Sequence, residues 1–77
     1  MKEICNTGLT KELIMELSGS QLKVLACLFY DIDPANSGLN MKTFKAAYEV
    51  LYQKGYVSAT WRKYNLLVKL QREDEDE

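Results

Sequence analysis

A chain of 77 residues with 47% hydrophobic content can bury the core of one small domain and is too apolar for wholesale disorder. The net charge of −1 hides an uneven distribution, because residues 40–72 hold seven basic residues against Glu49 alone, whereas residues 73–77 are all acidic. No apolar run is long enough to span a membrane. Cys5 and Cys27 do not form a disulfide framework, so we expect a soluble, cytoplasmic protein.

The first half of the chain is expected to be helical, after an N-terminal stretch that offers a short strand and a turn at residues 6–8. "LTKELIMEL" predicts a short helix with Thr10 as its N-cap. "SGSQLKVLACLFYDID", capped by Ser20, predicts a helix that is apolar nearly all round and therefore forms the buried centre of the domain. "MKTFKAAYEVLYQK" predicts a third helix between an Asn40 cap and Gly55 at the C′ position.

The C-terminal part is expected to be a β-hairpin. "YVSAT" is rich in residues that favour strands, and the alternation in "YNLLVKL" places Tyr64, Leu66, Val68 and Leu70 on one face. "WRK" then forms the tip of the hairpin. The predicted fold class is α+β, mainly α with a C-terminal β-hairpin, in a single domain over residues 1–72 followed by a disordered acidic tail at 73–77.

The stretch "FYDIDPANSGLNMKTF", residues 29–44, has the outline of a calcium-binding loop. If Asp31 takes the first position of an EF-hand loop, Lys42 falls at the twelfth, and if Asp33 does, Phe44 falls there. Neither register supplies the bidentate carboxylate that the twelfth position needs. We therefore expect a loop that positions the following helix, and no metal or cofactor.

Residues for catalysis are scarce. The chain has no histidine, no CxxC pair and no phosphate-binding glycine loop. Glu12 and Glu16 are spaced as like charges on one solvated helix face, and Cys5 has no base near it in the sequence. We expect a protein that is not an enzyme.

The stretch "TFKAAYEVLYQKGYV", residues 43–57, resembles the end of a winged helix-turn-helix recognition helix that runs into its wing. Residues 9–33 are similar to the opening of winged-helix modules in plasmid and phage replication or regulatory proteins. The resemblance covers residues 9–70 and implies three helices plus a wing. Only "IDPANSGL" separates the central helix from the third, so either the turn is elongated or one helix of the motif is missing.

The resemblance implies a small protein that binds double-stranded DNA, as a transcriptional regulator or a replication accessory factor of a mobile element, with a homodimer as one option. The charge of residues 40–72 supports this interpretation, and the acidic tail offers a way to cover the basic face. The expected DNA-binding residues are Lys42, Thr43 and Lys45 near the groove, Gln53 and Lys54 near phosphate, and Arg62 and Lys63 at the wing.

The alternative is a protein–protein interaction module without nucleic-acid binding, such as a phage-encoded inhibitor or adaptor. The pI of 5.4 and the aromatic residues, which are common anchors of interfaces, favour it. An exposed patch of Tyr52, Tyr56, Trp61 and Tyr64 would support this alternative, and burial of those rings would remove that support.

Overall fold

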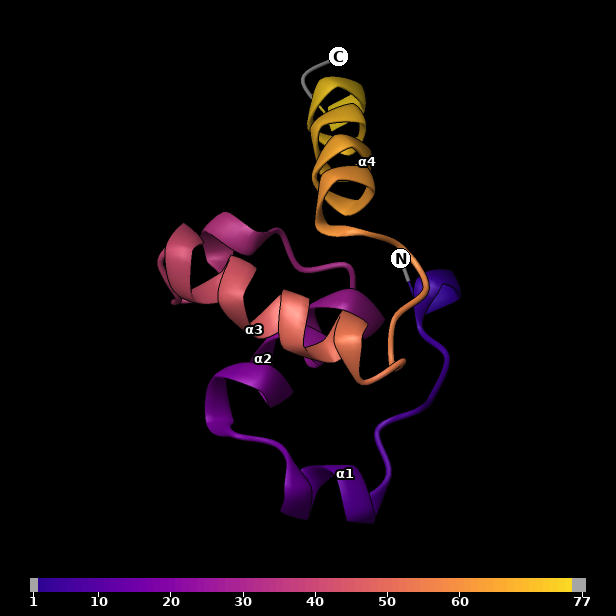
Figure 1. The fold of residues 1–77 in the computed structure, drawn as a ribbon. Coiled ribbons are helices and arrows are strands. Elements are labelled where there is room, and N and C mark those ends of the chain that lie inside the picture. The colour runs from indigo at the N-terminus through magenta and orange to yellow at the C-terminus, as the bar shows by residue number, and fades with distance from the viewer. Residues whose placement is uncertain (1, 76–77) are drawn as a thin grey trace.

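The computed structural model describes residues 2–75, and over this range the chain is helical apart from loops and one isolated β-bridge (Figure 1). In chain order the elements are the 3-10 turn η1 (Lys2–Ile4), α1 (Lys11–Glu16), α2 (Gly19–Phe29), the 3-10 turn η2 (Pro34–Asn36), α3 (Met41–Gln53) and α4 (Trp61–Glu75). None of these helices is both long and apolar enough to cross a membrane.

The helix starts follow capping chemistry that is visible in the sequence. Thr10 and Asn40 cap α1 and α3 as expected, each accepting a hydrogen bond from a backbone N–H three residues later. The cap of α2 is Ser18 and not the expected Ser20. Ser18 forms a reciprocal capping box with Gln21, which satisfies two backbone N–H groups at once and therefore starts the helix earlier.

The centre of the molecule is the packing of α2 against α3. The prediction that α2 is the buried core helix is confirmed, because three of its side chains are completely inaccessible. The apolar stripe of α3 faces it, except for Met41 at the exposed end of that stripe. The fully buried side chains of the pair are Val24, Leu25 and Leu28 from α2, and Phe44, Tyr48 and Leu51 from α3.

α3 ends as expected at Gly55, which has a φ of 82°. The N–H of Tyr56 then donates to the Leu51 carbonyl at 3.0 Å, closing a Schellman motif. The chain next runs antiparallel to the N-terminal segment, where the Ser58 N–H donates to the Ile4 carbonyl at 2.8 Å. One bridge, between residues 5 and 57, is all the β-structure among the described residues.

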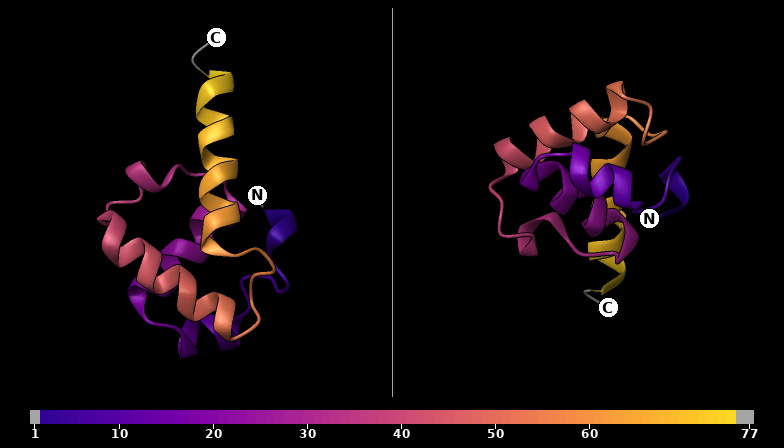
Figure 2. Two further views of the ribbon diagram at one scale, coloured as in Figure 1. Left: turned by 45° about the horizontal axis from the view of Figure 1, so that its top comes forward. Right: turned by 90° about the horizontal axis from the view of Figure 1, so that it is seen from below.

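The predicted C-terminal β-hairpin is wrong, because Trp61–Glu75 forms a single helix, α4. The α+β class and the wing are therefore replaced by an all-helical fold, and Arg62 and Lys63 lie in the first turn of α4, not at a hairpin tip. α4 lies across α3 and then extends past the helical body (Figures 1 and 2). The helix reaches Glu75, and residues 76–77 of the expected tail lie outside the described residues.

An aromatic cluster fixes α4 to α3. The Tyr48 ring stacks on Tyr64 with centroids 4.9 Å apart, and Trp61 meets Tyr48 edge-on at 5.5 Å. The Tyr48 hydroxyl donates to the Ala59 carbonyl at 2.6 Å, so the buried O–H and C=O satisfy each other. Because Tyr64 is buried and Trp61 is partly buried, the exposed aromatic patch that would mark an interaction module does not form.

Replacing Tyr48 by Phe keeps the stacked ring and leaves the Ala59 carbonyl without its buried donor. We expect the free energy of unfolding to fall by about 1–2 kcal/mol. Urea unfolding followed by circular dichroism measures the change. Tyr52→Phe is the matched control, because Tyr52 is exposed, and it should have almost no effect. Equal stabilities of the two variants would show that the Tyr48 hydroxyl does not hold α4.

Candidate nucleic-acid interface

The exposed face of α3 carries four of the seven expected DNA-binding residues, namely Lys42, Thr43, Lys45 and Gln53. All four side chains are exposed, because the buried positions of α3 lie on the opposite side of the helix. The start of the helix is held by Asn40, whose side chain accepts from the Thr43 N–H at 2.8 Å. The Thr43 hydroxyl is not used in that cap.

A groove of about 460 Å³ runs between α3 and the first turn of α4. Lys45 comes from one wall and Arg62 from the other, so the structure brings together two residues that are 17 positions apart in the chain. Gln53 lies at the same groove, and Glu49 is its one acidic lining residue. The groove therefore combines two cations and polar groups with a single carboxylate.

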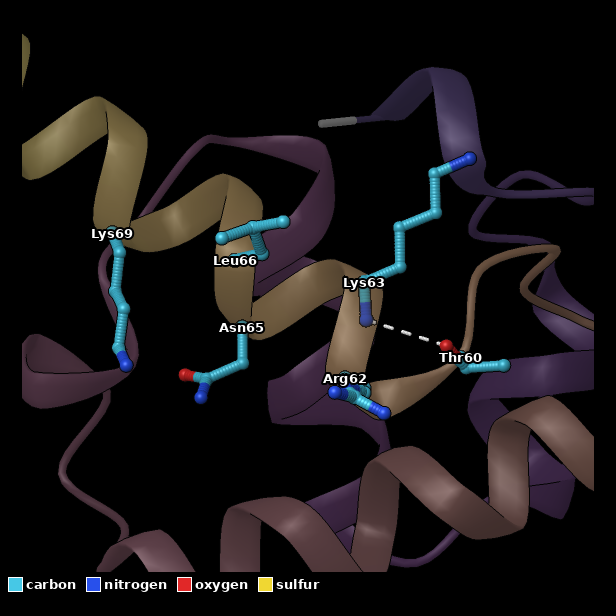
Figure 3. A pocket seen from close by; sticks show the side chains of 6 residues that line it. All are labelled: Thr60, Arg62, Lys63, Asn65, Leu66 and Lys69. Atoms are coloured by element: carbon cyan, nitrogen blue, oxygen red, sulfur yellow. Dashed lines mark hydrogen bonds between the residues drawn. The ribbon is translucent and has the colours of Figure 1, made fainter.

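α4 adds two further polar residues that sequence reasoning missed, Asn65 and Lys69. They follow Arg62 at helical spacing and extend from the same side of α4, whereas Lys63 extends the other way (Figure 3). The start of this helix is fixed by Thr60, whose hydroxyl accepts from the Lys63 N–H at 3.3 Å. A cap at Thr60 followed by core-facing residues at i, i+3 and i+7, namely Trp61, Tyr64 and Val68, is a helix signal that strand alternation concealed.

The cations of residues 40–72 fall into two groups. Lys54 lies 3.7 Å from Glu16 of α1, and Arg72 forms a bidentate pair with Asp33, so these two have carboxylate partners. Within the part of the chain that the structure describes, the remaining five have no carboxylate within 4 Å: Lys42, Lys45, Arg62, Lys63 and Lys69. Their charge is available to a ligand, whereas Lys54 is already engaged away from the expected phosphate contact.

The loop at residues 29–44 that resembles a calcium site has a structural role. Asp33 caps η2 by accepting from the Ala35 N–H at 2.8 Å, and both of its oxygens also accept from the Arg72 guanidinium at 2.6 Å. The hydrogen bonds from Arg72 are the main reason why the pKa of Asp33 lies below its usual value. Among residues 2–75, no three Asp, Glu, Cys or His residues gather in a way that could hold a metal ion.

The neighbouring Asp31 also has a backbone role. It adopts a φ of 53° after the end of α2, and the following Ile32 N–H donates to the Cys27 carbonyl at 3.0 Å. This is the same Schellman closure that Gly55 makes for α3, and Asp is one of the few residues with a side chain that enters the left-handed region readily. The acidic residues at the end of α2 thus shape a turn.

The thiols offer no activated nucleophile. Cys27 is buried and Cys5 is partly buried, and both are free. Burial is the main cause that raises the pKa of each, which disfavours the reactive thiolate.

No protein-family model, curated protein or solved structure matches this chain. The candidate interface consists of an exposed helix face, a groove beside it and, among the described residues, a cation without a carboxylate partner on each wall.

Asp33→Asn should lower the free energy of unfolding at neutral pH by no more than about 1 kcal/mol, because the Asp33–Arg72 pair is partly exposed. The folded-state pKa of Asp33 is lowered, so its contribution is complete above the unfolded pKa of about 3.9 and is lost as the pH falls through the folded value. The wild type and the variant should therefore converge in acid. Urea unfolding at neutral and acidic pH tests this, with the exposed Glu49→Gln as control; a difference that persists in acid would rule out the ion pair as its cause.

Proposed function

We propose that this protein binds double-stranded DNA through the exposed face of α3 and the adjacent side of α4. The observation that carries the proposal is the segregation of charge: Lys42, Lys45, Arg62 and Lys69 have no carboxylate partner in the described chain, whereas Lys54 and Arg72 are paired elsewhere. Lys45 and Arg62 line the groove between α3 and α4, and Lys42 and Lys69 lie further along the same two helices. A cluster of cations of this kind is the electrostatic footprint of a phosphate-binding surface.

The side-chain chemistry suggests which residues contact phosphates and which contact bases. The four cations contact phosphates and fix the register of the protein on the duplex. Thr43 and Gln53, which are exposed on α3, supply the neutral polar groups that can read base edges. A 13-residue helix is about 20 Å long and about 10–12 Å across with its side chains, which suits the major groove. Regulators and replication accessory factors both need such a surface, in the cytoplasm where DNA is accessible.

One observation favours the alternative of an interaction module without nucleic acid. Large apolar side chains are exposed on α1, where Met15 is 80% and Ile14 is 52% accessible. The aromatic argument for that alternative is weakened, because Tyr64 is buried and Trp61 is partly buried, although Tyr52 is exposed. These exposed residues are on a different element from the cations, so both functions can be tested independently.

The double variant Lys45→Glu/Arg62→Glu reverses one charge on each wall of the groove. We expect its affinity for a mixed-sequence duplex to fall at least about tenfold in about 50 mM salt, because two phosphate contacts are replaced by repulsion. Fluorescence anisotropy measures the binding. For the wild type, four phosphate contacts predict a slope of about −3.6 for log K against log salt concentration.

The matched control is Lys11→Glu/Lys23→Glu, which changes the net charge equally at exposed positions on α1 and α2. It should bind DNA nearly as tightly as the wild type, and circular dichroism should show that both variants fold. If both variants lose DNA affinity equally, the loss comes from net charge and not from the groove residues. No binding by the wild type at low salt would overturn the proposal.

A further inference from the structure

The groove between α3 and α4 is lined by aromatic side chains as well as by cations. Besides the two cations on its walls, Trp61 and Tyr52 line it. Tyr52 is 42% accessible and Trp61 is partly buried, so part of each ring is open to a ligand. Contacts to phosphate use charge and hydrogen bonds and no aromatic surface. Contacts to the backbone of a duplex therefore leave the two rings unused.

Trp61 is held in place by the core. Its ring lies 5.5 Å from the ring of Tyr48, 5.8 Å from that of Tyr64 and 6.0 Å from that of Phe44, between centroids. All three of these partners are buried. The indole N–H has no hydrogen-bond partner among the described residues and is not buried, so it can donate to a ligand. Trp61 thus contributes a fixed ring to the groove, which loses little conformational freedom when a ligand stacks on it.

The α3 wall of the groove adds polar groups in one line. Lys45, Glu49 and Gln53 line the groove and follow one another at four-residue spacing, which places them on one face of the helix. The cation can hold a phosphate, whereas the carboxylate and the amide offer acceptors and donors to the edge of a base. The volume of about 460 Å³ is within the range of about 300–1,000 Å³ that is usual for small-ligand sites. The groove therefore has the components and the size for one nucleotide.

We propose that the groove binds one unpaired nucleotide of a DNA strand, with its base stacked on the aromatic rings and its phosphate held by Lys45 and Arg62. This inference rests on the proposed function, because the same two cations supply the phosphate contact. Inside a duplex, neighbouring base pairs cover both faces of every base, and an aromatic side chain reaches only a base that has left the stack. Stacking on aromatic rings beside a cationic backbone track is how single strands are bound. The preferred ligand is therefore DNA with a single-stranded segment.

Trp61 is the one tryptophan of the chain, so its fluorescence reports on the groove. The full chain is titrated at low salt with a blunt duplex, with the same duplex extended by a short single-stranded overhang, and with the single strand alone. We expect the overhang to raise the affinity at least about fivefold, because stacking of one base is added to the phosphate contacts. Both ligands that contain unpaired bases should quench Trp61, and the blunt duplex should not.

Tyr52→Ala removes one ring and keeps a residue that favours the helix. It should lower the affinity for the overhang duplex about tenfold and leave the affinity for the blunt duplex and the circular dichroism unchanged. Tyr52→Phe keeps the ring and should bind as the wild type does. The matched control is Tyr30→Ala, because Tyr30 is 72% accessible and does not line the groove. Equal losses in the two alanine variants would show that Tyr52 is not a stacking residue of the groove and would overturn the proposal.

The titrations separate this inference from the proposed function. If the blunt and the overhang duplex bind equally and neither quenches Trp61, the nucleotide site is wrong and duplex binding stands. If only ligands with unpaired bases bind, the nucleotide site is supported and binding of double-stranded DNA is wrong. No binding to any of the three overturns both. Thymidine monophosphate should bind far more weakly than the single strand, and equal affinity would overturn the assignment to a DNA strand in favour of a free nucleotide.

Discussion

The placement of α4 depends on the stacked rings of Tyr48 and Tyr64 and on the hydrogen bond from the Tyr48 hydroxyl to the Ala59 carbonyl. This bond fixes Ala59, two residues before α4, and the stack fixes the first turn of the helix. Burial raises the pKa of both tyrosines, so both rings stay neutral in the stack. Because α4 supplies one wall of the groove, the position of Arg62 opposite Lys45 follows from this contact.

A second contact from α4 ties down the loop before α3. Arg72 donates hydrogen bonds to Asp33. Asp33 caps η2 and so shapes the loop that leads into α3. The two anchors lie eight residues apart on α4, at Tyr64 and Arg72, on the side that faces the body. The opposite side is left to Leu66 and Leu70. α4 therefore packs against the core with one face, whereas Leu66 and Leu70 on the other face are exposed.

The sequence was sufficient where the determining interactions are local. The caps at Thr10 and Asn40 and the turn at Gly55 depend on neighbours within five residues, and each was predicted correctly. The α4 segment failed because its apolar residues at 64, 66, 68 and 70 fit a strand period, while 64 and 68 also fit a helix period. The helix is favoured over the strand by the packing of Tyr64 on Tyr48, which is distant in the sequence. The charge distribution and the winged-helix resemblance suggested Lys42, Lys45 and Arg62 as candidates, whereas Lys69 is placed on the same side of α4 as Arg62 only by the helix (Figure 3).

The acidic end of the chain shows how a net charge of −1 is compatible with a cationic surface. α4 stays helical through Glu75, so the backbone of residues 73–75 runs away from the groove. From Arg62 to position 74 the helix rises about 18 Å, roughly twice the screening length at physiological ionic strength.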